Sequence, residues 1–533
     1  MKPYIRDRLI LYGLGVCVNG LIAVLVASPG YVDAYYYFNG GLSLAEGRGL
    51  GDPYLWHYVD APPSLPTPGF SYWQPLPAFL SALGIALFGR AAPFGAAQAV
   101  YVLAGSILPL ISYSVAKEVS GQRRHALIAG LLTVFSGFYT IYWSLPESFT
   151  PFALSGAGAL WLMGRARSTG RGWQWLAAGA CAGLAHLTRA DGLLLMAILI
   201  IAAFRPAWPE RDRGARFLVS AVALGSSGYA LAMLPWWARN LSVLGHVAPS
   251  GGLSTLWLIE YNDLFNYPSH LSAARYFSAG WVVILEGKWK ALTGNLATLI
   301  GVQNLVFLTP FTVIGLWRRW RDDLFLPATL YGASLFAAMT FAFSWPGVRG
   351  GYLHSGGALL PFIFAAALSG LDDTLRWVAR RRAGWRVEVS SQVFGWAMVS
   401  LAILISAFVV LTRVVGLSDL STISWNHSND VYDHIGKELN ALAVGETARV
   451  MSNNPPGFYT HTGRGGVPLP NGDERALLRA ADAYGVDFLV VDRHVVAALA
   501  DLYLEGPTSE RLELIETYGS TDSPVYLYRI RGE

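Results

Sequence analysis

Long apolar segments recur through the first three quarters of the chain, separated by short polar segments rich in arginine. A segment of about 20 apolar residues is long enough to cross the roughly 30 Å hydrocarbon core of a bilayer. One further run, 73–89, is ambiguous, because it is short and carries Pro75 and Pro77 near its start. The clear segments predict membrane spans at 9–28, 93–116, 125–143, 148–164, 173–188, 190–204, 217–237, 294–316, 324–344, 352–371 and 392–412.

Composition agrees with this pattern. The chain is 53% hydrophobic and 14% charged, whereas soluble proteins carry about 25% charged residues. The first apolar run follows Lys2, Arg6 and Arg8 and has the look of a signal peptide, but no clear small-residue cleavage site follows it. We interpret it as a retained first span of a polytopic α-helical membrane protein.

The two cysteines add little to the picture. Cys17 and Cys181 both fall within apolar spans, so we expect neither a disulfide framework nor a cysteine metal site. The net charge of +4 follows the placement of basic residues beside the spans, and we expect no nucleic-acid partner.

The basic residues between the spans predict the topology. By the positive-inside rule, these loops and the N-terminus lie in the cytoplasm. If 73–89 crossed the bilayer, the N-terminus and the basic loops would face opposite sides. We therefore place 73–89 in the interface or as a re-entrant segment, which leaves about eleven spans and an extracytoplasmic C-terminus. The basic clusters are Lys117, Arg123 and Arg124; Arg165, Arg167 and Arg171; Arg205, Arg211, Arg213 and Arg216; Arg318, Arg319 and Arg321; and Arg376, Arg380, Arg381, Arg382 and Arg386.

This topology divides the chain into a membrane domain, 1–412, and a soluble domain, 413–533. Two long outer loops, 29–92 and 238–293, are rich in tyrosine and tryptophan, and we expect both to lie at the membrane surface. In the tail, ARVMSNN, VDFLVVD and VYLYRI are typical of strands, and DERALLRAADAYG is typical of a helix that ends at Gly485. The tail is predicted to be a small α/β extracytoplasmic domain.

Ionisable residues gather at the outer ends of the spans, where such residues usually mark a functional site. Asp33 begins the first outer loop, and its carboxylate is suited to accept a proton from an attacking hydroxyl. Asp33 is equally suited to cap a helix. Glu147 follows Pro146 at the start of a span and is either a second functional acid or a first-turn helix acid.

Several basic residues share this outer face. Arg189 and Asp191, in HLTRADG, form either a local ion pair or a phosphate site, because a guanidinium matches phosphate geometry. Arg239 in PWWARN and Arg349 in GVRGGYLHSGG are further phosphate-binding candidates or headgroup anchors. His354 is a candidate proton donor or phosphate contact, and His57 is a weaker one.

A shared chemistry connects these residues. Transfer of a sugar from a polyprenyl phosphate needs a base for the acceptor and cations for the leaving phosphate. Asp33 and Glu147 offer oxygen ligands that a hard divalent cation, Mg or Mn, would accept, although no DxD spacing is present.

The sequence resembles the GT-C glycosyltransferases, in particular the branch with protein O-mannosyltransferases and the aminoarabinose transferase of lipid A. The resemblance covers roughly 9–371. It rests on the order of YVDAYYYFNGGLSLAEGRGL, SYWQPLPAFLSALGIALFG, LPESF, AHLTRADGLLL, PWWARNLSVLG and HSGGALLPFIFAAALSGL. Asp33 is followed by Ala34 rather than by the second acid of the O-mannosyltransferases, a departure that argues against protein mannosylation.

The resemblance implies an inverting transfer from a polyprenyl-phosphate sugar to a glycan, lipid or protein acceptor, with Asp33 as base. It implies a multi-pass protein of the cell membrane that acts at the outer face of the bilayer. A transporter or flippase of lipid-linked glycans is an alternative, but such proteins usually show paired halves with broken helices meeting at midplane. A non-catalytic glycan assembly protein is a second alternative; it would account for the soluble tail but not for the acids and arginines.

Overall fold

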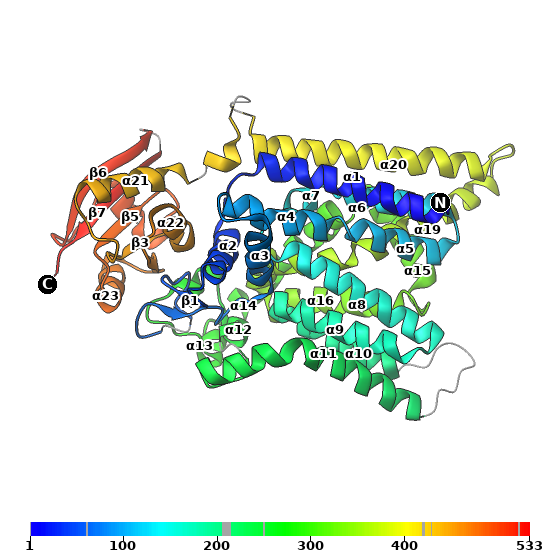
Figure 1. The fold of residues 1–533 in the computed structure, drawn as a ribbon, viewed down its shortest axis with the longest axis horizontal. Coiled ribbons are helices and arrows are strands. Elements are labelled where there is room, and N and C mark those ends of the chain that lie inside the picture. The colour runs from blue at the N-terminus through cyan, green and yellow to red at the C-terminus, as the bar shows by residue number, and fades with distance from the viewer. Residues whose placement is uncertain are drawn as a thin grey trace.

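The computed structural model describes residues 2–59, 62–204, 215–248, 251–417, 422–427, 429–520 and 523–532. A bundle of helices makes up most of the molecule, and a small domain containing a sheet projects from one end (Figure 1). Arg205, Arg211 and Arg213 of the third basic cluster lie outside the described residues.

Every predicted span coincides with helical structure. The helices are α1 (Pro3–Leu25), α4 (Pro93–Gly105), α5 (Leu108–Ser120), α6 (Arg123–Val134), α7 (Tyr139–Tyr142), α8 (Phe149–Thr169), α9 (Gly172–Thr188), α10 (Leu193–Phe204), α11 (Ala215–Leu244), α14 (Trp281–Ala297), α15 (Thr309–Arg319), α16 (Leu326–Ala337), α17 (Ser344–Pro346), α18 (Tyr352–Gly356), α19 (Leu360–Ala379) and α20 (Val387–Val410).

Within the described residues, five helical segments are long and apolar enough to cross a bilayer. Shorter apolar helices stand beside them, as expected where polar or irregular residues interrupt a span. The five segments are Pro3–Leu25, Pro93–Ser120, Ala215–Leu244, Ser344–Ala379 and Val387–Val415. The prediction of a multi-pass α-helical membrane protein is therefore confirmed.

Ion pairs join several basic clusters into one layer at the end of the bundle that holds the N-terminus. Arg123 pairs with Asp7 of α1 at 2.7 Å, and Arg165 at the end of α8 lies 3.8 Å from Glu118 of α5. Arg318, at the end of α15, lies 3.4 Å from Asp373 of α19. These clusters share one end of the bundle, as the positive-inside argument requires.

The ambiguous run 73–89 forms α3 (Leu76–Phe88), whose 13 residues span only about 20 Å, less than the hydrocarbon core. It packs on α2 (Val32–Ala45), the first helix of the outer loop. A Cβ on Gly41 of α2 would meet Ser81 and the Ala78 carbonyl of α3, so this close contact needs glycine. Both helices lie across the end of the bundle (Figure 1), and the length of α3 supports its non-spanning assignment.

The expectation that the aromatic residues of the first outer loop lie at the membrane surface is wrong for the start of α2. Tyr35, Tyr36 and Tyr37 are all buried within the protein. Tyr36 packs against Phe70 and Trp73, with ring centroids 5.1 and 4.8 Å apart. The tyrosines are covered because the loop folds back on α2 and the C-terminal domain packs beside it.

The second outer loop contains short helices, α12 (Gly251–Ser254) and α13 (Ala273–Ser278), joined by 3₁₀ turns. Asp263, which is buried, accepts hydrogen bonds from Arg275 at 2.5 and 3.0 Å and from the Ile259 amide at 2.8 Å. These bonds fold the loop into a fixed shape.

The predicted α/β character of the tail is confirmed. Its helices are α21 (Asp430–Ala441), α22 (Pro455–Thr462), α23 (Glu474–Tyr484) and α24 (Ala500–Leu504), and its strands are β3 (Val450–Ser452), β4 (Gly466–Pro468), β5 (Phe488–Val491), β6 (Leu512–Ser520) and β7 (Ser523–Ile530). The strand order is β4-β3-β5-β7-β6. Helix α23 begins at the cap Asp473 and ends at Gly485, which has φ 60°, as the sequence predicts.

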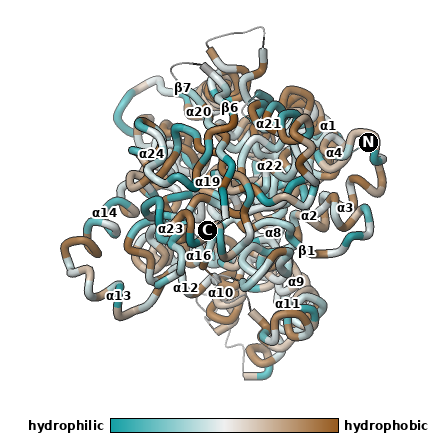
Figure 2. The backbone as a smooth tube through the Cα atoms, turned by 90° about the vertical axis from the view of Figure 1, so that its left-hand side faces the viewer, coloured by the Kyte–Doolittle hydropathy of each residue, from teal (hydrophilic) through white to brown (hydrophobic). Residues whose placement is uncertain are grey.

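The C-terminal domain packs on the first outer loop. The Leu55 amide donates to the Gly466 carbonyl at 2.9 Å, and Tyr54 forms a parallel bridge with Gly466, so the loop extends the β4 edge of the sheet. Tyr58 Oη donates to the Pro468 carbonyl at 2.6 Å. Figure 2, viewed from this end, shows the domain in front of the bundle with α2 and α3 beside it. The domain therefore covers the end of the membrane region that carries Asp33.

Candidate active site

Three chain segments far apart in sequence meet at the start of α2. Asp33 is the second residue of this helix, Glu147 lies in the turn between α7 and α8, and His354 lies in α18. One ligand atom from each residue lies within 4.8 Å of the other two. Two acids and an imidazole predicted separately from the sequence thus form one cluster.

Glu147 is fully buried and held by the start of α8. Its Oε2 accepts from the Phe149 amide at 2.9 Å, and its Oε1 accepts from Ser148 Oγ at 2.9 Å. A carboxylate in this position satisfies one of the unpaired amides at a helix N-terminus. Glu147 precedes the N-cap Ser148, so it is not a first-turn acid of α8. It nevertheless binds the amide of the first helical residue and is a member of the cluster.

His354 completes this arrangement through its Nδ1 atom. Nδ1 lies 2.8 Å from Ser148 Oγ and 3.2 Å from Glu147 Oε1. Because Ser148 donates its proton to Glu147, its oxygen is free to accept a hydrogen bond from Nδ1–H. Gly350 has φ 131°, and a Cβ there would lie 3.2 Å from His354 Nε2. Glycine at this position lets the chain turn closely around the imidazole.

Asp33 is not the N-cap of its helix; Tyr31 occupies that position, without a side-chain cap bond. The Asp33 side chain is half-buried. Withdrawal from water and the negative charge of Glu147 together raise the pKa of Asp33 to about 6. Burial would also raise the pKa of Glu147, but the charge and hydrogen bond of His354, with Arg189, hold it below its ordinary value. The two acids thus have different proton affinities.

Arg189 and Asp191 form the local ion pair expected from the sequence, with Nε 3.2 Å from Oδ1. The pair is also tied across the bundle, because Ser355 Oγ donates a short hydrogen bond to Asp191 Oδ2. The Arg189 charge acts on both Asp33 and Glu147. Arg189 therefore belongs to the cluster, and Asp191 fixes its position.

Arg349 lies next to the second outer loop. Its guanidinium is 4.7 Å from the ring centroid of Tyr261, a cation–π distance. Burial, together with the negative charge of Asp33, raises the pKa of Tyr261 to about 12, which indicates that this loop lies close to the acids. Tyr261 was not among the residues predicted from the sequence.

Two predicted residues are bonded elsewhere. The Arg239 guanidinium packs on Trp236, 4.7 Å from its ring centroid, and donates to the Gly69 carbonyl at 2.8 Å. His57 is buried against Trp56 and Tyr72, with ring centroids 4.3 and 4.8 Å away. His57 lies in the folded first outer loop, and Arg239 of α11 bonds to that loop; neither residue is among the ligand atoms of the Asp33 cluster.

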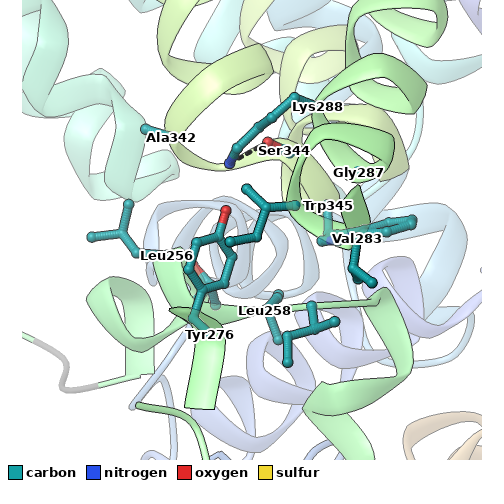
Figure 3. A pocket seen from close by; sticks show the side chains of 12 residues that line it. Leu256, Leu258, Tyr276, Val283, Gly287, Lys288, Ala342, Ser344 and Trp345 are labelled. Carbon is teal, nitrogen blue, oxygen red and sulfur yellow. Dashed lines mark hydrogen bonds between the residues drawn. The ribbon is translucent and has the colours of Figure 1, made fainter. Parts of the chain in front are cut away.

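A narrow groove between the second outer loop and α14 contains a lysine that the sequence reasoning did not single out. Lys288 Nζ lies 3.0 Å from Ser344 Oγ and 5.5 Å from the ring centroid of Tyr276 (Figure 3). The surrounding walls are mostly apolar, with Leu256, Val283 and Trp345 among them. Such a groove places a cation beside apolar surface at the outer end of a predicted span.

The end of the first outer loop and the spans after it match a family profile. Residues 68–236 match the sequence profile of the dolichyl-phosphate-mannose-protein mannosyltransferases. No curated protein matches the chain.

Solved structures share its architecture. The archaeal oligosaccharyltransferase AglB from Archaeoglobus fulgidus, in complex with an inhibitory peptide and a dolichol-phosphate, matches with a TM-score of 0.57 and 14% identity over 97% of this chain and 74% of AglB. ArnT from Cupriavidus metallidurans in the apo state matches with a TM-score of 0.55 and 14% identity over 98% of both chains. The chain therefore shares its fold with these two membrane proteins.

Proposed function

We propose that this protein is a GT-C glycosyltransferase, that it transfers a sugar from a polyprenyl-phosphate donor to an acceptor hydroxyl or amine with inversion, and that Asp33 is the general base. The observation that carries the proposal is the cluster of Asp33, Glu147 and His354 beside Arg189. Structures similar in fold include ArnT bound to undecaprenyl phosphate, with a TM-score of 0.50 and 16% identity, and AglB with a dolichol-phosphate. They support a lipid phosphate as the carrier.

In the proposed reaction, an acceptor O–H or N–H gives its proton to an Asp33 oxygen while the acceptor atom attacks the anomeric carbon. The bond from that carbon to the phosphate oxygen breaks, and its electron pair leaves with the polyprenyl phosphate. Attack opposite the leaving group inverts the anomeric centre. Arg189, Arg349 and His354 are suited to stabilise the charge that develops on the phosphate. Lys288 provides a further cation beside apolar surface for the prenyl chain.

The cluster also fits a divalent cation. Carboxylate oxygens from Asp33 and Glu147 suit Mg or Mn, and an imidazole ligand suits Zn and related metals. An AglB structure in complex with Zn and sulfate has a similar fold, with a TM-score of 0.55 and 16% identity. We propose that Asp33, Glu147 and His354 would hold such an ion, which when bound would supply positive charge near the leaving phosphate.

We further propose that the N-terminus is cytoplasmic and that the cluster and the C-terminal domain face outside. The ion pairs among the basic loops support this orientation, since basic segments beside spans are retained in the cytoplasm. Asp33 lies at the other end of α1 from Lys2 and Arg6, which places the transfer on the outer face.

The test is the replacement Asp33→Asn in a strain that lacks the native chain. We expect the lipid-linked sugar donor to accumulate to the same extent with the variant as with no protein. In reconstituted vesicles with that accumulated donor, we expect transfer to fall by about 10²- to 10⁴-fold. Normal turnover by Asp33→Asn would exclude the base assignment. Movement of the intact donor across the vesicle without breakage of its phosphate–sugar bond would instead support a flippase.

A further inference from the structure

The folded first outer loop and α2, the helix that carries Asp33, together line a cavity that is separate from the Asp33 cluster. Its volume is about 140 Å³, and its walls come from α2, from loop residues within 52–57 and 62–72, from Leu244 at the end of α11, and from His246 just after it. A cavity of roughly 150 Å³ in another protein admits benzene. The cavity beside α2 is therefore large enough to admit a six-membered ring.

A buried carboxylate lies in the wall of this cavity. Asp52 is only 8% exposed, and its Oδ2 accepts from Tyr36 Oη at 2.6 Å. A carboxylate can accept about four hydrogen bonds, so Asp52 keeps capacity for a ligand. Burial raises the pKa of Asp52 to about 7, even though the Tyr36 hydrogen bond and Arg239 oppose the rise. Near neutral pH this carboxyl can therefore both accept and donate.

A hydrogen-bond donor lies in the same wall. His57 Nδ1 accepts from the Val59 amide at 3.0 Å, so the proton of the neutral imidazole is on Nε2. Burial lowers the pKa of His57 to about 3, which keeps the ring neutral. Thr67 and Ser71 add hydroxyl groups to the lining.

Aromatic rings form the remaining walls. Trp56 lines the cavity and stacks on Trp73, which does not line it, with centroids 4.1 Å apart and planes within 6°. Tyr72 meets Trp56 edge-on at 5.1 Å. The position of the indole is thus fixed before any ligand enters, and fixed contacts lose little entropy on binding.

We propose that this cavity is a binding subsite for one neutral sugar ring of the acceptor glycan. Sugar hydroxyls need both acceptors and donors, which Asp52 and His57 supply, while the C–H faces of a sugar ring pack on aromatic rings. An ammonium ligand fits less well, because the positive charge of Arg239 already opposes the rise in the pKa of Asp52, and the His57 N–H would oppose a second cation. The statement that the bound sugar belongs to the acceptor rests on the proposed transfer reaction. The statement that the cavity binds a sugar ring does not depend on that reaction.

The cavity and the proposed base are joined by α2, because Tyr36 lines the cavity and Asp33 lies one turn earlier on the same helix. Burial and the negative charges of Glu147 and Asp33 raise the pKa of Tyr37, and the charge of Arg189 opposes the rise, so this ring lies near the cluster. A sugar held against Tyr36 would therefore lie next to the segment that carries the base.

The test measures binding without any donor. The probes are methyl pyranosides of mannose, glucose, galactose and arabinose, together with tetramethylammonium. Their binding to the full-length protein in detergent is measured by saturation-transfer difference NMR. We expect at least one glycoside to bind. Asp52→Asn, which keeps the shape of the side chain, should weaken that binding about tenfold, since a charged hydrogen-bond partner becomes neutral.

Asp52→Asn changes a buried residue and could disturb folding, so a second variant blocks the cavity from its exposed side. His246 lines the cavity and is exposed, so His246→Trp should close the opening and remove binding. Val247→Trp is the matched control, because Val247 is 43% exposed and does not line the cavity. Asp33→Asn should abolish transfer and keep glycoside binding, which separates the two proposals. Absence of binding by every glycoside, unchanged binding in His246→Trp, or preference for tetramethylammonium would overturn the subsite.

Discussion

Glu147 Oε1 lies 3.2 Å from His354 Nδ1, and Ser148 Oγ lies within hydrogen-bond distance of both atoms. This contact joins the turn before α8 to α18, which follows the irregular segment containing Arg349. It is the link that brings an acid predicted from one loop and a histidine predicted from another into one site.

We predict that Glu147→Gln lowers kcat by roughly 10- to 100-fold, as loss of a partner that orients an active-site group commonly does. The amide keeps the volume and an acceptor oxygen but removes the charge beside His354. Glu147→Ala would also leave the Ser148 hydroxyl and Phe149 amide without their partner, at a cost of about 1–3 kcal/mol of unfolding free energy. Kinetics and thermal unfolding of both variants would check this. A Glu147→Gln enzyme with unchanged kcat would contradict the assignment.

The pH dependence follows from the charge on Asp33. A general base works only when deprotonated, and the pKa of Asp33 is raised to about 6. We expect kcat/KM to be level above neutral pH and to fall about tenfold per pH unit below 6. Because the charge of Glu147 raises this pKa, Glu147→Gln should move the acid limb to lower pH. An acid limb that stays in place would show that another group controls it.

Metal binding can be tested apart from turnover. We expect one Mn²⁺ or Zn²⁺ per chain by isothermal titration calorimetry, with affinity lost about 10-fold or more in His354→Ala and in Asp33→Asn. Asp52→Asn is the control, since Asp52 lies in the other cavity. Equal affinity in all four proteins would place the ion elsewhere.

Sequence reasoning located the cluster because charge placement fixes which span ends share a side of the membrane. Charge placement predicts that Asp33, Glu147 and His354 share one face of the membrane, but it does not predict which way each helix is rotated about its axis. Arg239 therefore seemed equivalent to Arg189, although its guanidinium points to Gly69. Helix rotation and loop folding depend on long-range packing, which a single sequence does not display.

The same limit explains why Asp52 was missed. It lies in a proline-rich loop without helical or strand periodicity, so no pattern indicated that its side chain is buried. The tyrosines of α2 suggested a membrane surface because aromatic residues favour headgroups. The C-terminal domain and the folded loop cover them instead, a contact between segments more than 350 residues apart, as the Tyr58–Pro468 hydrogen bond shows.

Topology has an independent test in a background with Cys17→Ala and Cys181→Ala. Ser64 and Thr169 are both exposed, in the first outer loop and at the end of α8 that carries Arg167. We expect Ser64→Cys to react with an impermeant maleimide on intact cells and Thr169→Cys to react only after permeabilisation. The reverse labelling would invert the proposed orientation.

The last prediction concerns the link between the C-terminal domain and α2. Tyr35, two residues after Asp33, bonds through its hydroxyl to His461 Nε2 at 3.0 Å and accepts from Asn429 at 3.1 Å. His461 Nδ1 in turn lies 2.9 Å from Asp433. Because Tyr35 is 1% exposed, Tyr35→Phe removes two partly buried hydrogen bonds between α2 and the C-terminal domain, at about 1–3 kcal/mol.

We therefore expect Tyr35→Phe to lower the unfolding temperature and to reduce kcat several-fold, because α2 loses a contact that holds it in place. The acid limb of the pH profile should not move, because Asp33 keeps its charged neighbours. Tyr459→Phe is the matched control at the same interface. It removes an exposed hydrogen bond that Tyr459 Oη accepts from Arg48 at 2.9 Å, and such contacts contribute less than about 1 kcal/mol. Equal behaviour of the two variants would show that the domain covers the site without positioning the helix that carries Asp33.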